Sequence, residues 1–537
     1  MFDLLIKNGI IVDGSGKPAY KGDIAVKDGK IVKIAPCVEG EAAEVIDAEG
    51  HNVAPGFLDT HSHSDPFPLV GSDSCNYLQQ GVTTQIAGQC GSSYTPVTEE
   101  VTKEIKPYLN EEQYQAFMKA ADTPTSFMEA AGKAGIGTNF AFFIGQGQIR
   151  DRVMGFDGSK PTPEQMEEMK KWLREAMEAG FLGFSTGLVY APSVYADTDE
   201  LVELAKELVP YDGYYISHIR GEGRNIAKSM AEFFEIGERS GCNLWLSHFK
   251  VMTSAEPDYS IKVLKKMEEL TAAGKKIYAD QYPYNGGAAP LMSQLPPKYL
   301  YGGTAATVER LKDPEIRKKI EYSLYNEGDE FESNIIAAGF GSSLVVDAPG
   351  CPQYVNKTVQ QLADEQGKAP IDALCDLLIE NDGNCGGIYF CQCNTDLVRI
   401  MAHPLVFCGS DTADYLSCDY DPEQIGGGHP RGTGTMCRRI ELVRDFRMRT
   451  KEECIKNISY EPAQALGLGN IGLLAEGWNA DIVIFDYDNV HATADYQHPL
   501  RLNRGIETVI VNGKVSVRNG RTIPGVRAGK VLKHGKK

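Results

Sequence analysis

The chain has 537 residues, with 54 Lys and Arg against 73 Asp and Glu, so its formal net charge is −19 at pH 7. Its apolar content is that of a globular protein, which excludes a disordered chain, and no run of 18 apolar residues is present to cross a bilayer. Because the acidic balance leaves no basic stripe to neutralise phosphates, we expect neither a nucleic-acid nor a membrane partner.

Short apolar runs separated by turn residues occur at both ends of the chain. The runs lie at 2–12, 23–26, 30–34, 480–485, 508–511 and 514–517. Asp-Gly and Asn-Gly pairs between them are typical of hairpin turns. We expect the two ends, residues 1–54 and 470–537, to pair into one small β-sandwich domain.

The middle of the chain alternates short apolar segments with helical stretches. Eight such segments stand out, at 53–59, 83–88, 139–145, 182–186, 214–217, 244–247, 277–282 and 405–409. Eight strands with helical crossovers predict an α/β fold, a (β/α)8 TIM barrel, over residues 55–469.

Two helices and one insertion are predicted within this region. Thr162, Pro163 and Gln165 form a capping box that begins a helix over 162–179, and a second helix covers 224–240. The interval 285–385 is too long for a loop. It carries apolar runs at 334–338 and 343–346, which we interpret as strands of an inserted lid.

Metal-ligating residues follow the ends of several predicted strands. His61 and His63 come directly after the first strand, and in an extended chain residues i and i+2 share a face. The others end the second, fifth, sixth and eighth strands: Cys90, His218, His248 and Asp411. The carboxyl ends of barrel strands surround one mouth, so we expect these six side chains to meet there. Imidazole, carboxylate and thiolate ligands together suit Zn²⁺.

The motifs around these residues resemble those of the amidohydrolase superfamily and, within it, the N-acyl-D-amino-acid deacylase (D-aminoacylase) family. The resemblance spans nearly the whole chain and rests on the segments 56–63, 88–91, 184–188, 217–220, 247–250, 282–284, 409–411 and 429–431. It implies a tightly held Zn²⁺ on Cys90, His218 and His248. It also implies a second, weaker site on His61, His63 and Asp411, and whether that site is needed is left open.

The resemblance further implies hydrolysis of a small-molecule substrate, an N-acyl-D-amino acid, to a carboxylic acid and a D-amino acid. Metal-activated water would attack the amide, with Asp411 as general base and then general acid. Three residues are candidates for binding the substrate, chiefly its carboxylate: Lys250, Tyr282 and Arg431. Lys250 has an alternative role as an ion-pair partner of Glu222 or Asp280.

Other functions of the same fold remain open at this point. A cyclic-amide hydrolase of the hydantoinase or dihydroorotase type typically has a lysine at the end of the fourth strand, where this chain has Ser185-Thr186-Gly187. A dipeptidase is a further alternative. A nucleobase deaminase would use a glutamate near the fifth-strand histidine, and Glu222 is at that spacing. A non-enzymatic scaffold is disfavoured because all six ligands are present.

The cysteine count bears on the cellular compartment. Thirteen cysteines are an odd number in a chain too large to need disulfides, and Asp3 and Lys7 interrupt the apolar stretch of a secretory leader. We therefore expect reduced thiols and a cytoplasmic location. Whether the chain forms a homo-oligomer is left open.

Overall fold

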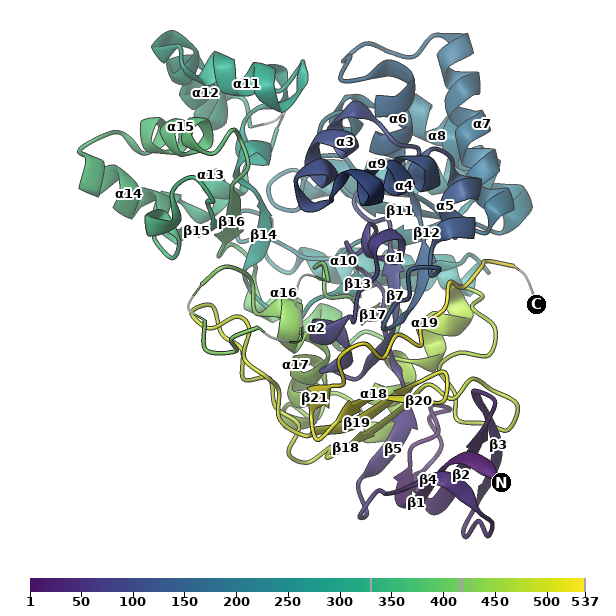
Figure 1. Ribbon diagram of the computed structural model, residues 1–537. Coiled ribbons are helices and arrows are strands. Elements are labelled where there is room, and N and C mark those ends of the chain that lie inside the picture. Colours follow the sequence, from purple (N-terminus) through teal and green to yellow (C-terminus); the bar gives the residue numbers. More distant parts are fainter. Residues whose placement is uncertain (329–330, 415–417, 419, 425, 536–537) are drawn as a thin grey trace.

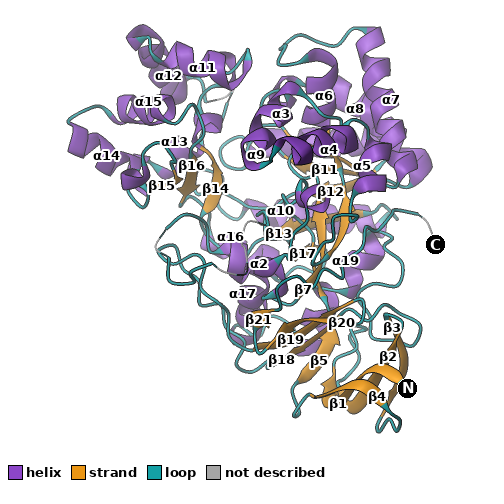
Figure 2. Cartoon of the chain, viewed as in Figure 1, coloured by secondary structure: helices purple, strands orange, loops and turns teal. Residues whose placement is uncertain are grey.

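An eight-stranded parallel barrel forms the centre of the molecule (Figure 2). The computed structural model describes residues 1–328, 331–414, 418, 420–424 and 426–535. The barrel strands are β6 (Phe57–Asp59), β7 (Val82–Ala87), β8 (Asn139–Phe142) continued by β9 (Ile144–Gly145), β10 (Gly183–Gly187), β11 (Tyr214–His218), β12 (Asn243–Leu246), β13 (Ile277–Gln281) and β17 (Val406–Cys408). The Thr60 N–H donates to the Cys408 carbonyl at 3.1 Å and closes the ring. The predicted barrel is confirmed.

The first predicted segment, 53–59, is two strands rather than one. β5 (Asn52–Pro55) belongs to the sheet of the chain ends, whereas β6 belongs to the barrel. The chain passes between them at Gly56, where a Cβ would lie 2.0 Å from the Thr83 hydroxyl oxygen. The apolar run is continuous in sequence because both strands are buried, so periodicity alone did not show the boundary.

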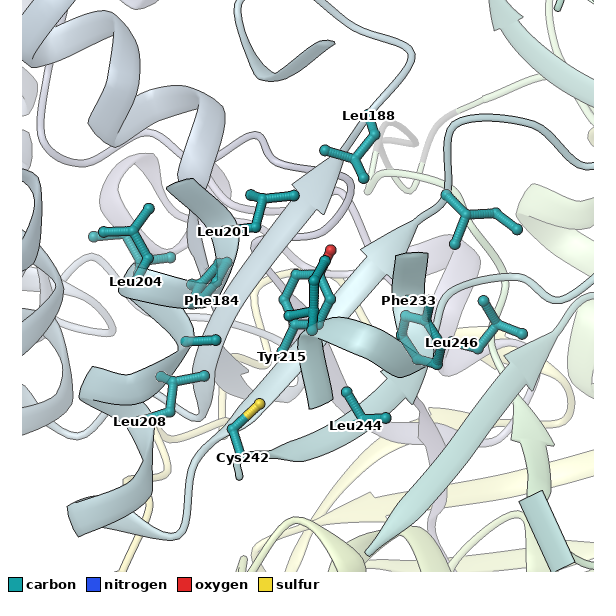
Figure 3. Close-up of a cluster of buried hydrophobic side chains, with 14 of the residues drawn as sticks. Phe184, Leu188, Leu201, Leu204, Leu208, Tyr215, Phe233, Cys242, Leu244 and Leu246 are labelled. Atoms are coloured by element: carbon teal, nitrogen blue, oxygen red, sulfur yellow. The ribbon is translucent and has the colours of Figure 1, made fainter. Parts of the chain in front are cut away.

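Helices pack around the outside of the barrel. They include α6 (Gln146–Met154), α7 (Pro163–Ala179), α8 (Thr198–Ala205), α9 (Ile226–Ser240), α10 (Tyr259–Ala272), α16 (Asn394–Met401) and α17 (Arg431–Asp445). Figure 3 shows part of this packing, in which Phe184, Tyr215 and Leu246 from the strands contact side chains of α8 and α9. Fully burying one such side chain contributes about 1.5–3 kcal/mol.

The two predicted helices are present, and one of them is shorter than expected. The Thr162 and Gln165 side chains accept each other's backbone N–H, which confirms the capping box of α7. The helix predicted over 224–240 begins at Ile226 instead. The N–H of Arg224 donates to the Glu332 carboxylate at 2.9 Å, so this tertiary contact holds the residue before the helix in a turn.

Strands from both ends of the chain form one nine-stranded sheet. They are β1 (Phe2–Ile11), β2 (Tyr20–Lys27), β3 (Lys30–Ala35), β4 (Ala42–Asp47), β5, β18 (Ile482–Phe485), β19 (Ile506–Val511), β20 (Lys514–Arg518) and β21 (Arg521–Thr522). β5 and β18 join the two halves, with Val53 opposite Ile484. Ile6 and Ile24 from the N-terminal half share a core with Ile510 from the C-terminal half. The pairing of the ends is confirmed, and the description as a sandwich stays a prediction.

The inserted segment builds a compact unit beside the barrel mouth (Figure 1). It contains an antiparallel sheet of β14 (Gly287–Pro290), β16 (Gly386–Tyr389) and β15 (Ser343–Asp347), with α11 (Gly303–Leu311), α12 (Pro314–Asn326), α13 (Asn334–Ala338), α14 (Val359–Gln366) and α15 (Pro370–Glu380). An apolar core of its own holds these elements together. The unit ends at Tyr389, four residues beyond the predicted end at 385, because β16 is the middle strand of its sheet. Its role as a lid, and the domain division at 54 and 470, stay predictions.

One of the two strands predicted in the insertion is wrong. Residues 343–346 lie in β15 as expected, but 334–338 form the helix α13. The Ala337 N–H donates to the Ser333 carbonyl, and Gly339 ends the turn at a φ of 84°. A short apolar run does not by itself distinguish a strand from a buried helical turn.

A group of helices that the sequence analysis did not anticipate stands at the barrel mouth, across from the insertion (Figure 1). It comprises α1 (Phe67–Val70), α3 (Glu99–Ile105), α4 (Glu111–Ala121) and α5 (Pro124–Ala130). Val101, Ile105 and Phe117 form its small apolar core. These residues precede the third strand, so the loops after the first two strands supply a wall of the site.

Two further expectations concern the chain as a whole. None of the thirteen cysteines, all of which lie within the described residues, forms a disulfide bond. Within the described part of the chain, no helix has both the length and the apolarity needed to span a bilayer.

Candidate metal centre

The six predicted ligands meet at the carboxyl ends of the barrel strands. Their donor atoms form two groups, and within each group all donors lie within 4.8 Å of one another. One group contains Cys90, His218 and His248, and the other contains His61, His63, Cys90 and Asp411. Cys90 belongs to both, so its sulfur would contribute to holding an ion in either group.

The spacing of the donor atoms fits zinc. The Cys90 Sγ lies 3.3 Å from Nε2 of His248 and 3.4 Å from Nε2 of His61. Nδ1 of His218 lies 3.0 Å from Nε2 of His248. Zn–S and Zn–N bonds of about 2.3 and 2.0–2.1 Å place the donors of a tetrahedral site about 3.3–3.6 Å apart. The donor set therefore needs only small shifts to hold the ion.

Three of the ligand residues have an unusual backbone conformation. Cys90, His248 and Asp411 have φ values of 53°, 33° and 55°, in the left-handed region that non-glycine residues rarely occupy. Each follows the end of a barrel strand, so the sharp turn directs its side chain into the mouth. Such strain is commonly found where the surrounding structure holds a functional group in place.

Asp280, on β13, positions the metal ligands without being one of them. Its Oδ1 lies 3.0 Å from Nδ1 of His61 and accepts the His248 backbone N–H at 2.7 Å, and its Oδ2 accepts from Nε1 of Trp245 at 2.6 Å. A proton on Nδ1 of His61 leaves Nε2 free for a metal. The sequence analysis named Asp280 only as a partner of Lys250. A carboxylate inside an apolar barrel strand was the signal for its role.

Asp411 lies between a predicted metal ligand and a cation. Its Oδ1 is 3.1 Å from Nε2 of His63, and its Oδ2 accepts from Nη1 of Arg431 at 2.8 Å. Burial raises the pKa of Asp411, but Arg431 and the nearby imidazoles outweigh it and hold that pKa well below its ordinary value. Asp411 is therefore ionised at neutral pH and can accept a proton.

Cys90 is in an environment that favours the thiolate. Burial raises the pKa of its thiol, but His248 and His61 bring that pKa well below its ordinary value. The thiolate is the form of cysteine that binds metals. The electrostatics of the site therefore support the ligand role of Cys90.

Lys250 is paired with Glu222, the alternative that the sequence analysis left open. Its Nζ donates to Oε1 of Glu222 at 2.6 Å and lies 2.8 Å from Nδ1 of His248. Lys250 and Glu222 are 7% and 5% exposed. Burial raises the pKa of Glu222, but Lys250 and His218 bring it to about 2. The predicted role of Lys250 toward a substrate stays a prediction.

The other two candidates for substrate binding lie beside Lys250. The Tyr282 hydroxyl accepts from Nε2 of Gln392 at 2.7 Å. The Arg431 guanidinium lies 4.8 Å from the centre of the Tyr282 ring, and the Lys250 ammonium lies 5.8 Å from it. The structure thus brings the three residues together around one aromatic ring next to Asp411.

We expect Lys250→Met to destabilise the protein. The substitution leaves the Glu222 carboxylate buried without its cation, and breaking a buried ion pair costs about 3–5 kcal/mol. The free energy of unfolding, measured with denaturant, should fall by this amount. In the double variant Lys250→Met/Glu222→Leu most of the loss should disappear. A single variant as stable as the wild type would show that the pair contributes nothing.

Cavities open from the metal centre. A cavity of about 740 Å³ is lined by Cys90, Asp411 and Arg431 and extends between α3 and the inserted unit. A much smaller one, about 20 Å³, is lined by His218, His248, Lys250 and Tyr282, among others. The space next to the predicted ligands is thus large enough for a small-molecule ligand.

Residues 44–517 match the amidohydrolase family, and the chain belongs to this family. It is 29% identical over 532 residues to a D-aminoacylase of Alcaligenes xylosoxydans xylosoxydans, covering 99% of this chain and 97% of that protein. It is 28% identical over 535 residues to an N-acyl-D-aspartate deacylase of the same organism, covering 99% and 95%. The resemblance drawn from the motifs is confirmed.

Solved structures agree with this assignment. An N-acyl-D-glutamate deacylase from Bordetella bronchiseptica, in complex with zinc and a phosphonate mimic of the tetrahedral intermediate, superimposes with a TM-score of 0.80 at 26% identity, covering 99% of both chains. An L-hydantoinase from Arthrobacter aurescens gives a TM-score of 0.57 at 15% identity, covering 99% of this chain and 100% of that one. The hydantoinase shares the fold alone.

Proposed function

We propose that this chain is a zinc-dependent N-acyl-D-amino-acid deacylase, which hydrolyses the amide of an N-acyl-D-amino acid to a carboxylic acid and a D-amino acid. The observation that carries the proposal is the pair of donor groups that share Cys90 at the barrel mouth. The similarity to a D-aminoacylase and to an N-acyl-D-aspartate deacylase over 99% of the chain supports the substrate class.

Asp411 carries the proton transfers of the proposed reaction. When bound, zinc supplies Lewis acidity, which lowers the pKa of water toward about 7 and polarises a carbonyl oxygen. The ionised Asp411 carboxylate takes a proton from the attacking water and then gives it to the departing nitrogen, as general base and general acid. Arg431 donates to Oδ2 of Asp411, so Oδ1 is the oxygen that faces His63 and the metal ligands.

We propose that the substrate carboxylate lies near Arg431, Tyr282 and Lys250. Arg431 lines the 740 Å³ cavity, and within the described part of the chain only Nη1 of its guanidinium donates a hydrogen bond, to Asp411. A guanidinium has five N–H donors, so several remain for a carboxylate. The Lys250 ammonium hydrogen-bonds to Glu222 and lies close to His248. Its positive charge beside Tyr282 would attract the substrate carboxylate.

We expect Arg431→Met to lower kcat/KM for an N-acyl-D-amino acid by roughly 10- to 100-fold. A hydrogen bond to a charged group contributes about 1.5–3 kcal/mol. The same variant should be measured on the matching carboxamide, which lacks the charge. A smaller loss on the carboxamide supports carboxylate binding. An equal loss on both would mean that Arg431 acts through Asp411 instead.

The remaining parts of the proposal concern the setting of the enzyme. We propose that the inserted unit, 285–385, acts as a lid on the barrel domain 55–469, because it lines the 740 Å³ cavity with Ala289 and Gly383. The free cysteines favour a reducing compartment, and we propose the cytoplasm. A homo-oligomer stays a prediction.

Two alternatives are less well supported by the site. The end of β10 carries Thr186, whose hydroxyl donates to Ser217 at 2.9 Å, in place of the lysine typical of cyclic-amide hydrolases. Glu222, which a deaminase would use, is committed to Lys250 at 2.6 Å. A dipeptidase would also cleave a linear amide, and the substrate panel separates it.

The test is a substrate panel on the purified zinc-loaded protein. It contains the N-acetyl derivatives of D-methionine, D-aspartate and D-glutamate, their L-enantiomers, a dipeptide, a hydantoin and adenine. Release of the free D-amino acid from at least one N-acetyl-D compound, with less than about 1% of that rate on the other classes, supports the proposal. Turnover of the hydantoin, the dipeptide or adenine alone would overturn it.

A further inference from the structure

A second cavity opens beside the metal centre, separate from the cavity that carries Arg431. It has a volume of about 550 Å³ and is bounded by Phe67, Val70, Tyr94, Ile105 and Leu109, with His63 at its inner end. We call it the side cavity. Its walls come from α1, from α3 and from the residues that follow it, the helices that stand across from the inserted unit (Figure 1).

The lining of the side cavity excludes a carboxylate. No Lys or Arg occurs among the described residues that line it, and two acidic residues, Asp65 and Glu104, border it. A substrate carboxylate placed there would lose water without gaining a cation as partner, which is unfavourable. An apolar group would bury its surface against Phe67, Val70 and Ile105 and gain the hydrophobic stabilisation of that burial.

The side cavity and the 740 Å³ cavity meet at the metal centre. Both are lined by His63, Ser92, Glu104 and Ala413. His63 is also one of the predicted ligands, so an amide held at the metal centre lies at the junction of the two cavities. One arm of the substrate then extends toward Arg431, and the other extends into the side cavity.

From this geometry we propose that the side cavity binds the acyl group, and that the enzyme prefers N-acyl-D-amino acids with acyl chains longer than acetyl. This inference rests on the proposed deacylase function. The charged arm of the substrate belongs near Arg431, because that cavity supplies the cation. The acyl arm carries no charge whichever amino acid is attached, and a cavity of about 550 Å³ is far larger than an acetyl group requires.

The experiment measures kcat/KM of the holoenzyme for N-acetyl, N-butanoyl, N-hexanoyl and N-octanoyl derivatives of D-methionine and of D-glutamate. Burying one methylene raises kcat/KM by a factor of about four at most. An octanoyl group has six more methylenes than an acetyl group, so even partial burial should raise kcat/KM at least tenfold from acetyl to octanoyl in both series. A rise in both series assigns the cavity to the acyl group, because the side chain is constant within each series.

Two valine variants in the same helical group provide a matched pair. Val70 lines the side cavity but not the larger one, and Val101 lines the larger one but not the side cavity. Both contact the same apolar cluster. Val70→Phe should lower the octanoyl-to-acetyl ratio of kcat/KM at least tenfold, whereas Val101→Phe should leave that ratio within about twofold. Leu109→Trp, at the partly exposed edge of the side cavity, replaces Val70→Phe if that variant does not fold.

Product inhibition gives a second measurement. Octanoate should inhibit the wild-type holoenzyme at least tenfold more strongly than acetate, and Val70→Phe should abolish the difference. Equal kcat/KM for all four acyl groups, with N-acetyl substrates hydrolysed, would overturn the acyl assignment and leave the proposed function intact. The acyl assignment would also be overturned if the effect of Val70→Phe on kcat/KM depended on the amino-acid side chain and not on the length of the acyl group. Zinc-loaded protein that hydrolysed no member of either series would overturn both proposals.

Discussion

Replacing Cys90 by alanine is expected to remove the tightly held zinc and lower turnover by more than about 100-fold. A zinc site with three protein ligands that loses one of them holds the ion far more weakly, and even outer-shell changes cost 10- to 100-fold. Cys90 belongs to both donor groups, so its loss affects both positions. Zinc content after gel filtration and kcat/KM for the best N-acetyl-D substrate check this prediction.

His63→Ala is the matched control for Cys90→Ala. His63 belongs to one donor group only, so this variant should keep the zinc held by Cys90, His218 and His248. The comparison separates loss of one particular site from a general effect of replacing a predicted ligand at the mouth. If Cys90→Ala retained one zinc per chain and normal turnover, the ligand assignment would be wrong.

Asp411→Asn is expected to lower kcat by about 10²–10⁴-fold while the tight zinc stays bound. The amide has nearly the shape of the carboxylate but cannot take up a proton, and general acid–base catalysis contributes a factor of this size. Asp411 is not in the group formed by Cys90, His218 and His248, so that zinc has no reason to leave. Metal analysis and single-turnover kinetics on the same preparation measure the two effects.

The pH dependence provides a further check on Asp411. Because the pKa of Asp411 is held well below its ordinary value, the carboxylate stays ionised when the pH falls from 7 to 5. The fall in wild-type kcat at low pH should therefore not be caused by protonation of Asp411.

The zinc content of Asp411→Asn gives the result that would contradict the proposed role. Loss of zinc from this variant in parallel with activity would identify Asp411 as a structural ligand.

The sequence allowed the six ligands and the barrel to be predicted together, because both depend on local patterns. An apolar segment of four to seven residues identifies a buried strand, and the residues that follow it lie at the common mouth of the barrel. His218 and His248 could be placed there without any contact information. The same applies to the two chain ends, whose turn residues mark the strands of the terminal sheet.

Predictions that depended on the partner of a residue were less complete. Lys250 was assigned to the substrate carboxylate with Glu222 as an alternative, and the structure shows that Nζ donates to Glu222 at 2.6 Å. Asp280 holds His61 and His248 in position from the neighbouring strand. These contacts join residues about 30 or more positions apart in the sequence. Their spacing therefore does not distinguish them from contacts with other residues.

The sequence by itself determined where the barrel strands lie and which metal-binding side chains follow them, since these follow from hydrophobic periodicity and from the type of each side chain. Only the tertiary structure decided which segments of the chain surround the mouth of the barrel. The helices α1, α3, α4 and α5 and the inserted unit come from distant parts of the chain and lie on opposite sides of the barrel mouth (Figure 1). The side cavity lies between such segments, and its shape depends on their packing. Packing is a property of contacts in space, which one sequence does not specify residue by residue.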